Sequence, residues 1–373
     1  MRVPFSAFNN TLLPRLQNLS EAQNKAMSQL ASGQRVTRAS DDPLAVNRGL
    51  QLETRKNREQ QYYQNGGHAK DVCDATFSQL QHLTDISSRV SELSSQASGT
   101  SSAAELKTYA TEINELIENA VDSANGQFQG DYLFAGSNTG NAPFTVTRST
   151  LTGKVSAASY VGGPATPTSP PATVDTTANS TTVAVPVGSA AGLAAGMKVT
   201  VGAFSSTIVA VDTTNNTITL ADAPTTTQAG AAAVFSGDEG AGIRVSASEM
   251  VHPGTSGDEN AALATFINNL VALRDGMTAG NSAAVVAART ALNTSEDGLM
   301  SSITRLGTIQ YRLDFARTQA TNTFAALDKE FGQQVDIDFA QVTLNLNRTQ
   351  TAYQAALQSA ARIASQSLLD YLR

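Results

Sequence analysis

The feature that most constrains this chain is a long stretch between Pro43 and Gly99 that contains no further proline. Asp42 can cap a helix there, and Pro43 suits the first helical position, where its missing N–H is not needed. Gly49 and the pair Gly66-Gly67 are the glycines that weaken the stretch. A helix of about 55 residues is about 80 Å long at about 1.5 Å per residue. We therefore expect an elongated, mainly helical molecule.

Both ends of the chain carry the spacing of a coiled-coil seam. The seam near the start comprises Leu12, Leu16, Leu19, Gln23, Ala26 and Leu30, and the one near the end comprises Leu346, Thr349, Tyr353, Ala356, Ala360 and Ile363. Steps that alternate between three and four predict amphipathic helices that pair. Two thin helices bury little between them, and an uncovered apolar face marks a binding surface. We expect the terminal helices to contact a partner.

Between the ends, the pattern predicts a helical frame with a β-rich insert. Ser102 and Glu105 form a capping box for a third helix, and "FQGDYLFAG" predicts a short hairpin after it. Short Val- and Thr-rich runs from about 181 to 237 predict strands, with a turn at Asn215-Asn216, whereas the Pro-rich "ATPTSPPATVD" predicts an exposed connection. Helix resumes near Glu259, and a further long helix begins near Ser282 and is expected to break at Gly332.

These elements predict a nested domain plan for a mainly α fold. Residues 1–42 and 331–373 would form a terminal coiled coil, residues 43–140 and 257–330 a rod of long helices with a short hairpin, and residues 141–256 an inserted outer β domain.

No pattern in the sequence predicts catalysis, a cofactor or a metal site. His68, His82 and His252 are the only histidines, and His68 and His82 lie about 21 Å apart on one helix at about 1.5 Å per residue. Cys73 is the only cysteine and fits a helical core position. Asp336 and Asp338 precede the last helix, where carboxylates favour capping.

The composition also excludes several classes of partner and location. The net charge is −7, which argues against nucleic acid, and we read the basic stretch of Arg55, Lys56 and Arg58 as the solvated face of a helix. No run is long and apolar enough for a membrane span. The start "MRVPFSAFNN" lacks the apolar core of a cleaved secretory signal, so we expect either an internal protein or export by another route.

Three stretches resemble the flagellin family. "LASGQRVTRASDDP" is similar to the family segment that links the first two helices, and it contains Ser32, Gly33, Arg35, Asp41, Asp42 and Pro43. "GDYLFAG" resembles the short β motif of the family branch that forms the hook–filament junction, and "AYQAALQSAARIASQSLLDYL" resembles the C-terminus of that branch. The final residues, Ser367 to Arg373, differ from the ending typical of filament flagellins.

The resemblance implies a non-enzymatic structural adaptor of the bacterial flagellum. It implies export through the flagellar type III channel with the help of an export chaperone, and assembly into a ring between hook-associated protein 1 and flagellin. It also implies that the terminal helices become ordered pairs on assembly. The residues expected to pack there are Leu12, Leu16, Leu19, Ala26, Leu30, Leu346, Tyr353, Leu357, Ile363, Leu368, Leu369, Tyr371 and Leu372. A filament flagellin, or an extracellular coiled-coil adhesin or fibre, remain the alternatives.

Overall fold

The computed structural model describes residues 5–36, 40, 42–97, 102–167 and 170–371, with side chains from residue 13 to residue 362. The chain divides into two units. The terminal unit comprises residues 1–61 and 319–373, and the central unit comprises residues 62–318. Within the described residues, none of the helices is long and apolar enough to cross a membrane.

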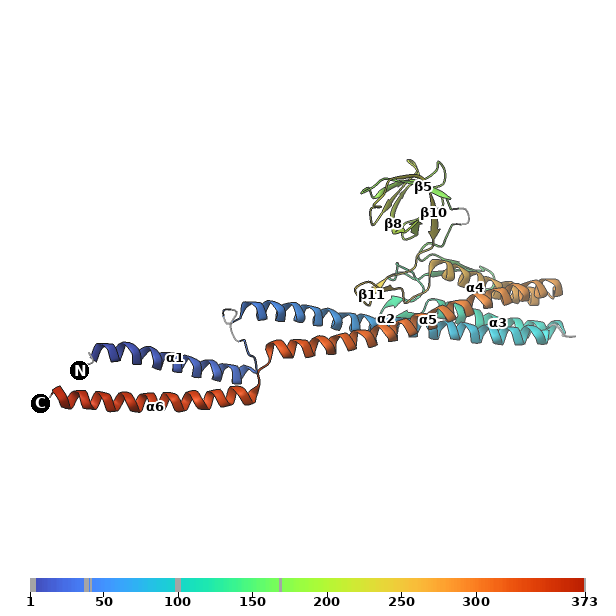
Figure 1. The fold of residues 1–373 in the computed structure, drawn as a ribbon. Coiled ribbons are helices and arrows are strands. Elements are labelled where there is room, and N and C mark those ends of the chain that lie inside the picture. Colours follow the sequence, from blue (N-terminus) through green and yellow to red (C-terminus); the bar gives the residue numbers. More distant parts are fainter. Residues whose placement is uncertain (1–4, 37–39, 41, 98–101, 168–169, 372–373) are drawn as a thin grey trace. The chain divides into compact units, whose positions relative to one another are not determined.

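The terminal unit is built from both ends of the chain. Helix α1 (Phe5–Ser32) packs side by side with α6 (Phe339–Tyr371), and the start of α1 lies next to the end of α6 (Figure 1). The unit also contains the first part of α2 (Pro43–Ala97) and the last part of α5 (Ser282–Val335). Helix α2 begins at Pro43 as predicted. The predicted break at Gly332 is wrong, because α5 continues through this glycine, which a helix interior tolerates at a cost of about 1 kcal/mol.

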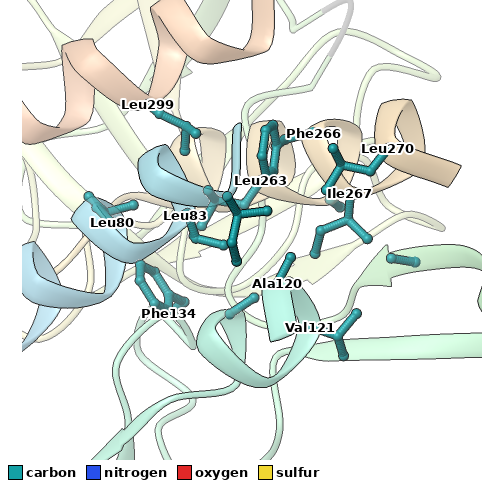
Figure 2. Close-up of a cluster of buried hydrophobic side chains, with 14 of the residues drawn as sticks. Leu80, Leu83, Ala120, Val121, Phe134, Leu263, Phe266, Ile267, Leu270 and Leu299 are labelled. Carbon is teal, nitrogen blue, oxygen red and sulfur yellow. The ribbon is translucent and has the colours of Figure 1, made fainter. Parts of the chain in front are cut away.

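In the central unit, four helices surround one apolar core. The remainder of α2 and α5 packs with α3 (Ala103–Ala124) and α4 (Gly257–Thr278). Figure 2 shows side chains from all four helices in contact around Leu83 and Ile267, with Phe134 joining from a connecting segment. Ser102 and Glu105 form the predicted capping box at the start of α3. Ser256 and Glu259 form a second box at the start of α4.

Three short hairpins pack on this helical body. They are β1 (Gln127–Phe128) with β2 (Asp131–Tyr132), β3 (Phe144–Arg148) with β4 (Val155–Tyr160), and β11 (Ile243–Arg244) with β12 (Met250–Val251). The first is the hairpin predicted from "FQGDYLFAG", and both of its turn residues, Gln129 and Gly130, have positive φ, which matches the twist of a tight hairpin.

Two asparagine side chains hold the β3–β4 hairpin against the helices. The Asn125 amide exchanges two hydrogen bonds with the backbone of Phe144, at 3.0 and 3.1 Å. The Asn268 amide does the same with Ala158, at 2.8 Å each. Phe144, Val155 and Ala158 accordingly belong to the core of the central unit.

The remaining strands close into a six-stranded antiparallel barrel in the order β10-β5-β6-β9-β8-β7. The strands are β5 (Thr173–Thr176), β6 (Thr182–Ala184), β7 (Lys198–Val201), β8 (Phe204–Asp212), β9 (Thr217–Leu220) and β10 (Gln228–Ser236). The turn at Asn215-Asn216 forms as predicted, because the Asp212 carboxylate accepts hydrogen bonds from the N–H groups of Thr214 and Asn215. The prediction that the whole Pro-rich stretch is an exposed connection is wrong at its end. The prolines of the stretch end before Thr173, where β5 begins, and Val174 is buried inside the barrel.

The barrel has a hydrophobic core of its own. Val199, Ile208, Ile218 and Phe235 are buried in a cluster separate from that of the helical body. The two segments that lead into and out of the barrel meet at Asp238, which is 4% exposed. Its carboxylate accepts hydrogen bonds from the N–H groups of Ser137, at 2.6 Å, and Gly240, at 2.8 Å. The bond from Ser137 fastens the base of the insert to the segment that follows β2, and the bond from Gly240 holds the turn after Asp238.

We predict that deletion of residues 173–236, closed by a short Gly-Ser linker, leaves the helical body folded. The barrel core is separate, so its removal opens no cavity among the helices. Circular dichroism of the purified chain should retain the helical signal per helical residue, and the thermal midpoint of that signal should shift by no more than a few degrees. A collapse of the helical signal would contradict this independence.

Candidate assembly surface

The connections α1–α2 and α5–α6 bind each other through their backbones. Gln34 and Asp336 form an isolated antiparallel β-bridge. On either side of it, the Arg35 N–H donates to the carbonyl of Val335, at 2.6 Å, and the Ile337 N–H donates to that of Gly33, at 3.1 Å. This two-stranded contact, residues 33–35 with 335–337, is called the clasp below. It joins the two ends of the chain where each one turns from one helix into the next.

Arg35 reinforces the clasp with its side chain. Its guanidinium donates to the carbonyl of Gln334, at 3.2 and 3.4 Å, and lies 3.4 Å from the Asp42 carboxylate. Gln29 in turn donates to the Arg35 carbonyl at 2.6 Å. Arg35 therefore connects the end of α5 with the start of α2.

The helices that enter and leave the clasp are capped by residues of the predicted linker motif. Gly33 has φ +71°, the left-handed conformation that ends a helix, and its N–H donates to the Gln29 carbonyl. Ser32 accepts a hydrogen bond from the Gln34 N–H. Asp42 caps α2 by accepting from the Ala45 N–H at 3.0 Å, and Asp338 caps α6 by accepting from the Gln341 N–H at 3.1 Å.

Capping also changes the acidity of Asp42. The Ala45 N–H, and after it the Arg35 guanidinium, stabilise the charged carboxylate and hold the pKa of Asp42 below its ordinary value, although partial desolvation opposes them. Asp41, also part of the predicted motif, lies outside the described residues. The structure thus brings Ser32, Gly33, Arg35, Asp42 and Pro43 together around one connection.

The terminal helix pair buries little apolar surface. Among the side chains described on α1 and α6, Ala26 alone is buried. Nine of the predicted seam residues are half-buried: Leu16, Leu19, Gln23, Leu30, Leu346, Thr349, Tyr353, Ala356 and Ala360. Leu357 is exposed, as are Leu13, Met27 and Leu344. The side chains of Leu12, Ile363, Leu368, Leu369 and Tyr371 lie outside the description, as does the whole of Leu372.

A cation between two aromatic rings is the part of this unit that the sequence reasoning missed. The Lys56 ammonium lies 5.4 Å from the Phe324 ring centroid and 4.8 Å from that of Phe331, and it pairs with Asp328. Phe324 and Phe331 are one heptad apart, with Asp328 between them, and that spacing was the available signal. From the sequence we had expected Lys56 to lie on the solvated face of a helix. Its contacts show that this face is not purely solvated.

The groups that could support chemistry are dispersed. Cys73 is fully buried, and desolvation raises the pKa of its thiol to about 11, so it is the inert core residue that the sequence predicted. His82 contacts the Ser123 hydroxyl at 2.7 Å, while His252 lies 3.6 Å from a Glu239 carboxylate oxygen. Within the described part of the chain, no group of three or more His, Cys, Asp or Glu residues could hold a metal ion.

Comparison with known protein families identifies the class of this chain. Residues 6–139 match the bacterial flagellin N-terminal helical region, and residues 290–372 match the bacterial flagellin C-terminal helical region. Together the two matches cover more than half of the chain. The chain belongs to the flagellin family, and it is a structural component of the bacterial flagellum rather than an enzyme.

Among curated proteins, the chain is similar to a flagellar filament 30.7 kDa core protein of Treponema maltophilum. The two are 35% identical over 122 residues, which is 31% of this chain and 41% of that protein. The chain thus matches only about two fifths of the length of this curated relative.

One solved structure shares the fold, and a second is similar at a lower score. A putative flagellar hook-associated protein from Vibrio parahaemolyticus is 15% identical, with a TM-score of 0.52 over 79% of this chain and 100% of that one. FlgL from Bacillus cereus is 16% identical, with a TM-score of 0.46 over 76% of this chain and 99% of that one.

We predict that the Asp42 carboxyl titrates below the ordinary value near 3.8. A lowered pKa in the folded state adds stability that is complete above the unfolded-state value and is lost as the pH falls through the folded-state pKa. The start of α2 should therefore loosen only in strongly acidic solution, below a pH of about 3.8. Carboxyl carbon NMR shifts measured across the acid range give the midpoint.

Arg35→Ala provides the control, because the Ala45 N–H is the larger cause and remains in that variant. The midpoint should rise but stay below the ordinary value. An unshifted midpoint in the original chain, or a full return to the ordinary value in Arg35→Ala, would contradict the capping role of Asp42.

Proposed function

We propose that this chain is the subunit of the hook–filament junction. In this proposal, copies of the chain form a ring that connects hook-associated protein 1 on the hook side to flagellin on the filament side. The observation that carries the proposal is the terminal helix pair, which leaves large apolar side chains beside its seam exposed in a single copy.

Exposed apolar residues beside the seam of two paired helices support assembly. Leu13, Met27, Leu344 and Leu357 expose 62%, 47%, 44% and 43% of their surface, although they lie on regular helices of the terminal unit. Fully burying one such side chain contributes about 1.5–3 kcal/mol. Neighbouring subunits that cover these residues would stabilise the pair in the assembly far more than in the free chain.

Two sequence motifs favour the junction over the filament. "GDYLFAG" forms the β2 end of the first hairpin and ends directly before Ser137, whose N–H donates to Asp238, and it resembles the junction branch of the family. The C-terminal "AYQAALQSAARIASQSLLDYL" resembles that branch as well. The name of the Vibrio protein with the same fold, a putative hook-associated protein, agrees with this choice.

A filament subunit is the second candidate. The curated relative is a filament core protein, and its 35% identity over 122 residues is the observation that favours this reading. The two candidates differ in abundance and position, because a filament subunit recurs along the whole filament whereas a junction subunit occupies one place at its base.

We also propose a route by which the chain reaches the hook–filament junction. The chain would travel unfolded through the flagellar type III export channel, with its C-terminal helix held by an export chaperone beforehand. A lone buried cysteine is compatible with passage in this form, because the chain needs no intramolecular disulfide.

The test is electron microscopy of cells that lack this chain, with flagellin in the culture medium measured in parallel. Because the junction would be absent, we expect hooks without filaments and flagellin released into the medium. Cells complemented with the original chain provide the control and should regain filaments. Intact filaments on cells without the chain would contradict the junction role and favour a minor filament subunit.

A further inference from the structure

A groove lies beside the start of α2 in the terminal unit, and nothing in the clasp or in the seam of α1 and α6 uses it. Its volume is about 370 Å³, and it is lined by Leu44, Asn47, Arg48, Gln51, Leu52, Arg55 and Glu330. Leu44 is 82% exposed. The groove therefore places one exposed leucine beside two arginines.

The two arginines differ in whether a carboxylate of the same chain pairs with them. Arg48 pairs with Glu330 at 2.9 Å and is still largely exposed. Arg55 is exposed, and the described part of the chain supplies no carboxylate partner for it. One guanidinium has five N–H donors, so each arginine has N–H groups left to donate to a carboxylate of another copy.

The outer face of α3 in the central unit has the opposite charge. Glu105, Glu112, Glu115 and Asp122 follow one another at helical spacing along this face. Glu105 is held in the capping box, and Glu112 pairs with Arg89 at 2.7 Å. Glu115 and Asp122 are exposed, and no ion pair engages either of them among the described residues.

The spacings of the two charged pairs match. Arg48 and Arg55 are one heptad apart on α2, and Glu115 and Asp122 are one heptad apart on α3. At about 1.5 Å per residue, each pair spans about 10.5 Å along its helix. Two helices that lie against each other can therefore place both arginines opposite both carboxylates at once.

We propose that the groove of one copy receives the α3 face of a second copy, with Arg48 and Arg55 opposite Glu115 and Asp122. This inference rests on the proposed function, since it names the contact through which the subunits assemble. Every copy carries both surfaces, and a contact between two different surfaces repeats from copy to copy, which generates rings or helices. Leu44 is covered in the contact, while the charge pairs set its register.

Charge reversal with rescue tests the pairing. Cells without the native chain would carry Arg55→Glu, Glu115→Arg, or both, and the chain would be quantified in isolated flagella. We expect each single variant to lower incorporation about tenfold or more, because like charges then face each other, and the double variant to restore it. Lys329→Glu is the matched control, an exposed lysine of the same unit outside the groove, and should incorporate normally.

Cross-linking gives a second readout that does not depend on incorporation. Gln51→Cys lies in the groove, and Asn119→Cys lies on the acidic face between Glu115 and Asp122. A chain with both cysteines should form disulfide-linked multimers in flagella, whereas each single cysteine should not. Buried Cys73 does not interfere.

The outcomes separate this contact from the proposed function. Filaments restored by all charge variants, with no cross-linked multimers, would overturn the contact and leave the junction role standing. Loss in both single variants without rescue in the double variant would also overturn it. Absence of even the original chain from flagella would overturn both proposals.

Discussion

The structure depends on the antiparallel pairing of the first helices of the chain with the last ones. In the terminal unit, α1 pairs with α6, and Arg48 and Lys56 of α2 pair with Glu330 and Asp328 of α5. In the central unit, Lys70 pairs with Asp314, and the buried Cys73 thiol contacts the Leu306 carbonyl. Exposed ion pairs contribute little energy, so the apolar stripe provides stability and the charges fix which residues face each other. The clasp likewise fixes which residues of the α1–α2 and α5–α6 connections face each other.

This pairing explains why the middle of the chain can hold a barrel. The helices already meet on either side of the insertion point. The only geometric requirement on the insert is therefore that its two ends lie close together. The six-stranded barrel does so with its own core, and the bonds around Asp238 bind its two connecting segments to the helical body. The barrel is closed, and therefore presents no unpaired strand edge to neighbouring molecules.

Local signals made much of the fold predictable from the sequence. Pro43 and Asp42 mark the start of α2, the Ser102–Glu105 box marks α3, and the heptads mark the helical seams; each of these depends on residues a few positions apart. The clasp was not predictable, because Arg35 and the Gln334 carbonyl are 299 positions apart and the contact uses backbone groups that carry no sequence signal. Within the linker motif, Asp42 and Pro43 carried a local capping signal, whereas Arg35 was singled out only through the resemblance to the family. The helix break predicted at Gly332 was wrong, because a glycine can lie inside a helix when the residues around it stabilise that helix.

The difference between a free subunit and an assembled one is the central claim, and hydrogen exchange measures it directly. Amide exchange on α1 and α6 would be compared between the purified chain and isolated flagella, with α3 and α4 as internal references. Because only Ala26 is buried among the described side chains of the terminal pair, α1 and α6 should exchange much faster than the reference helices in the free chain. In flagella, the terminal helices should become as protected as the references. Equal protection of α1 and α6 in the two states would contradict the claim that neighbouring subunits cover the terminal helices.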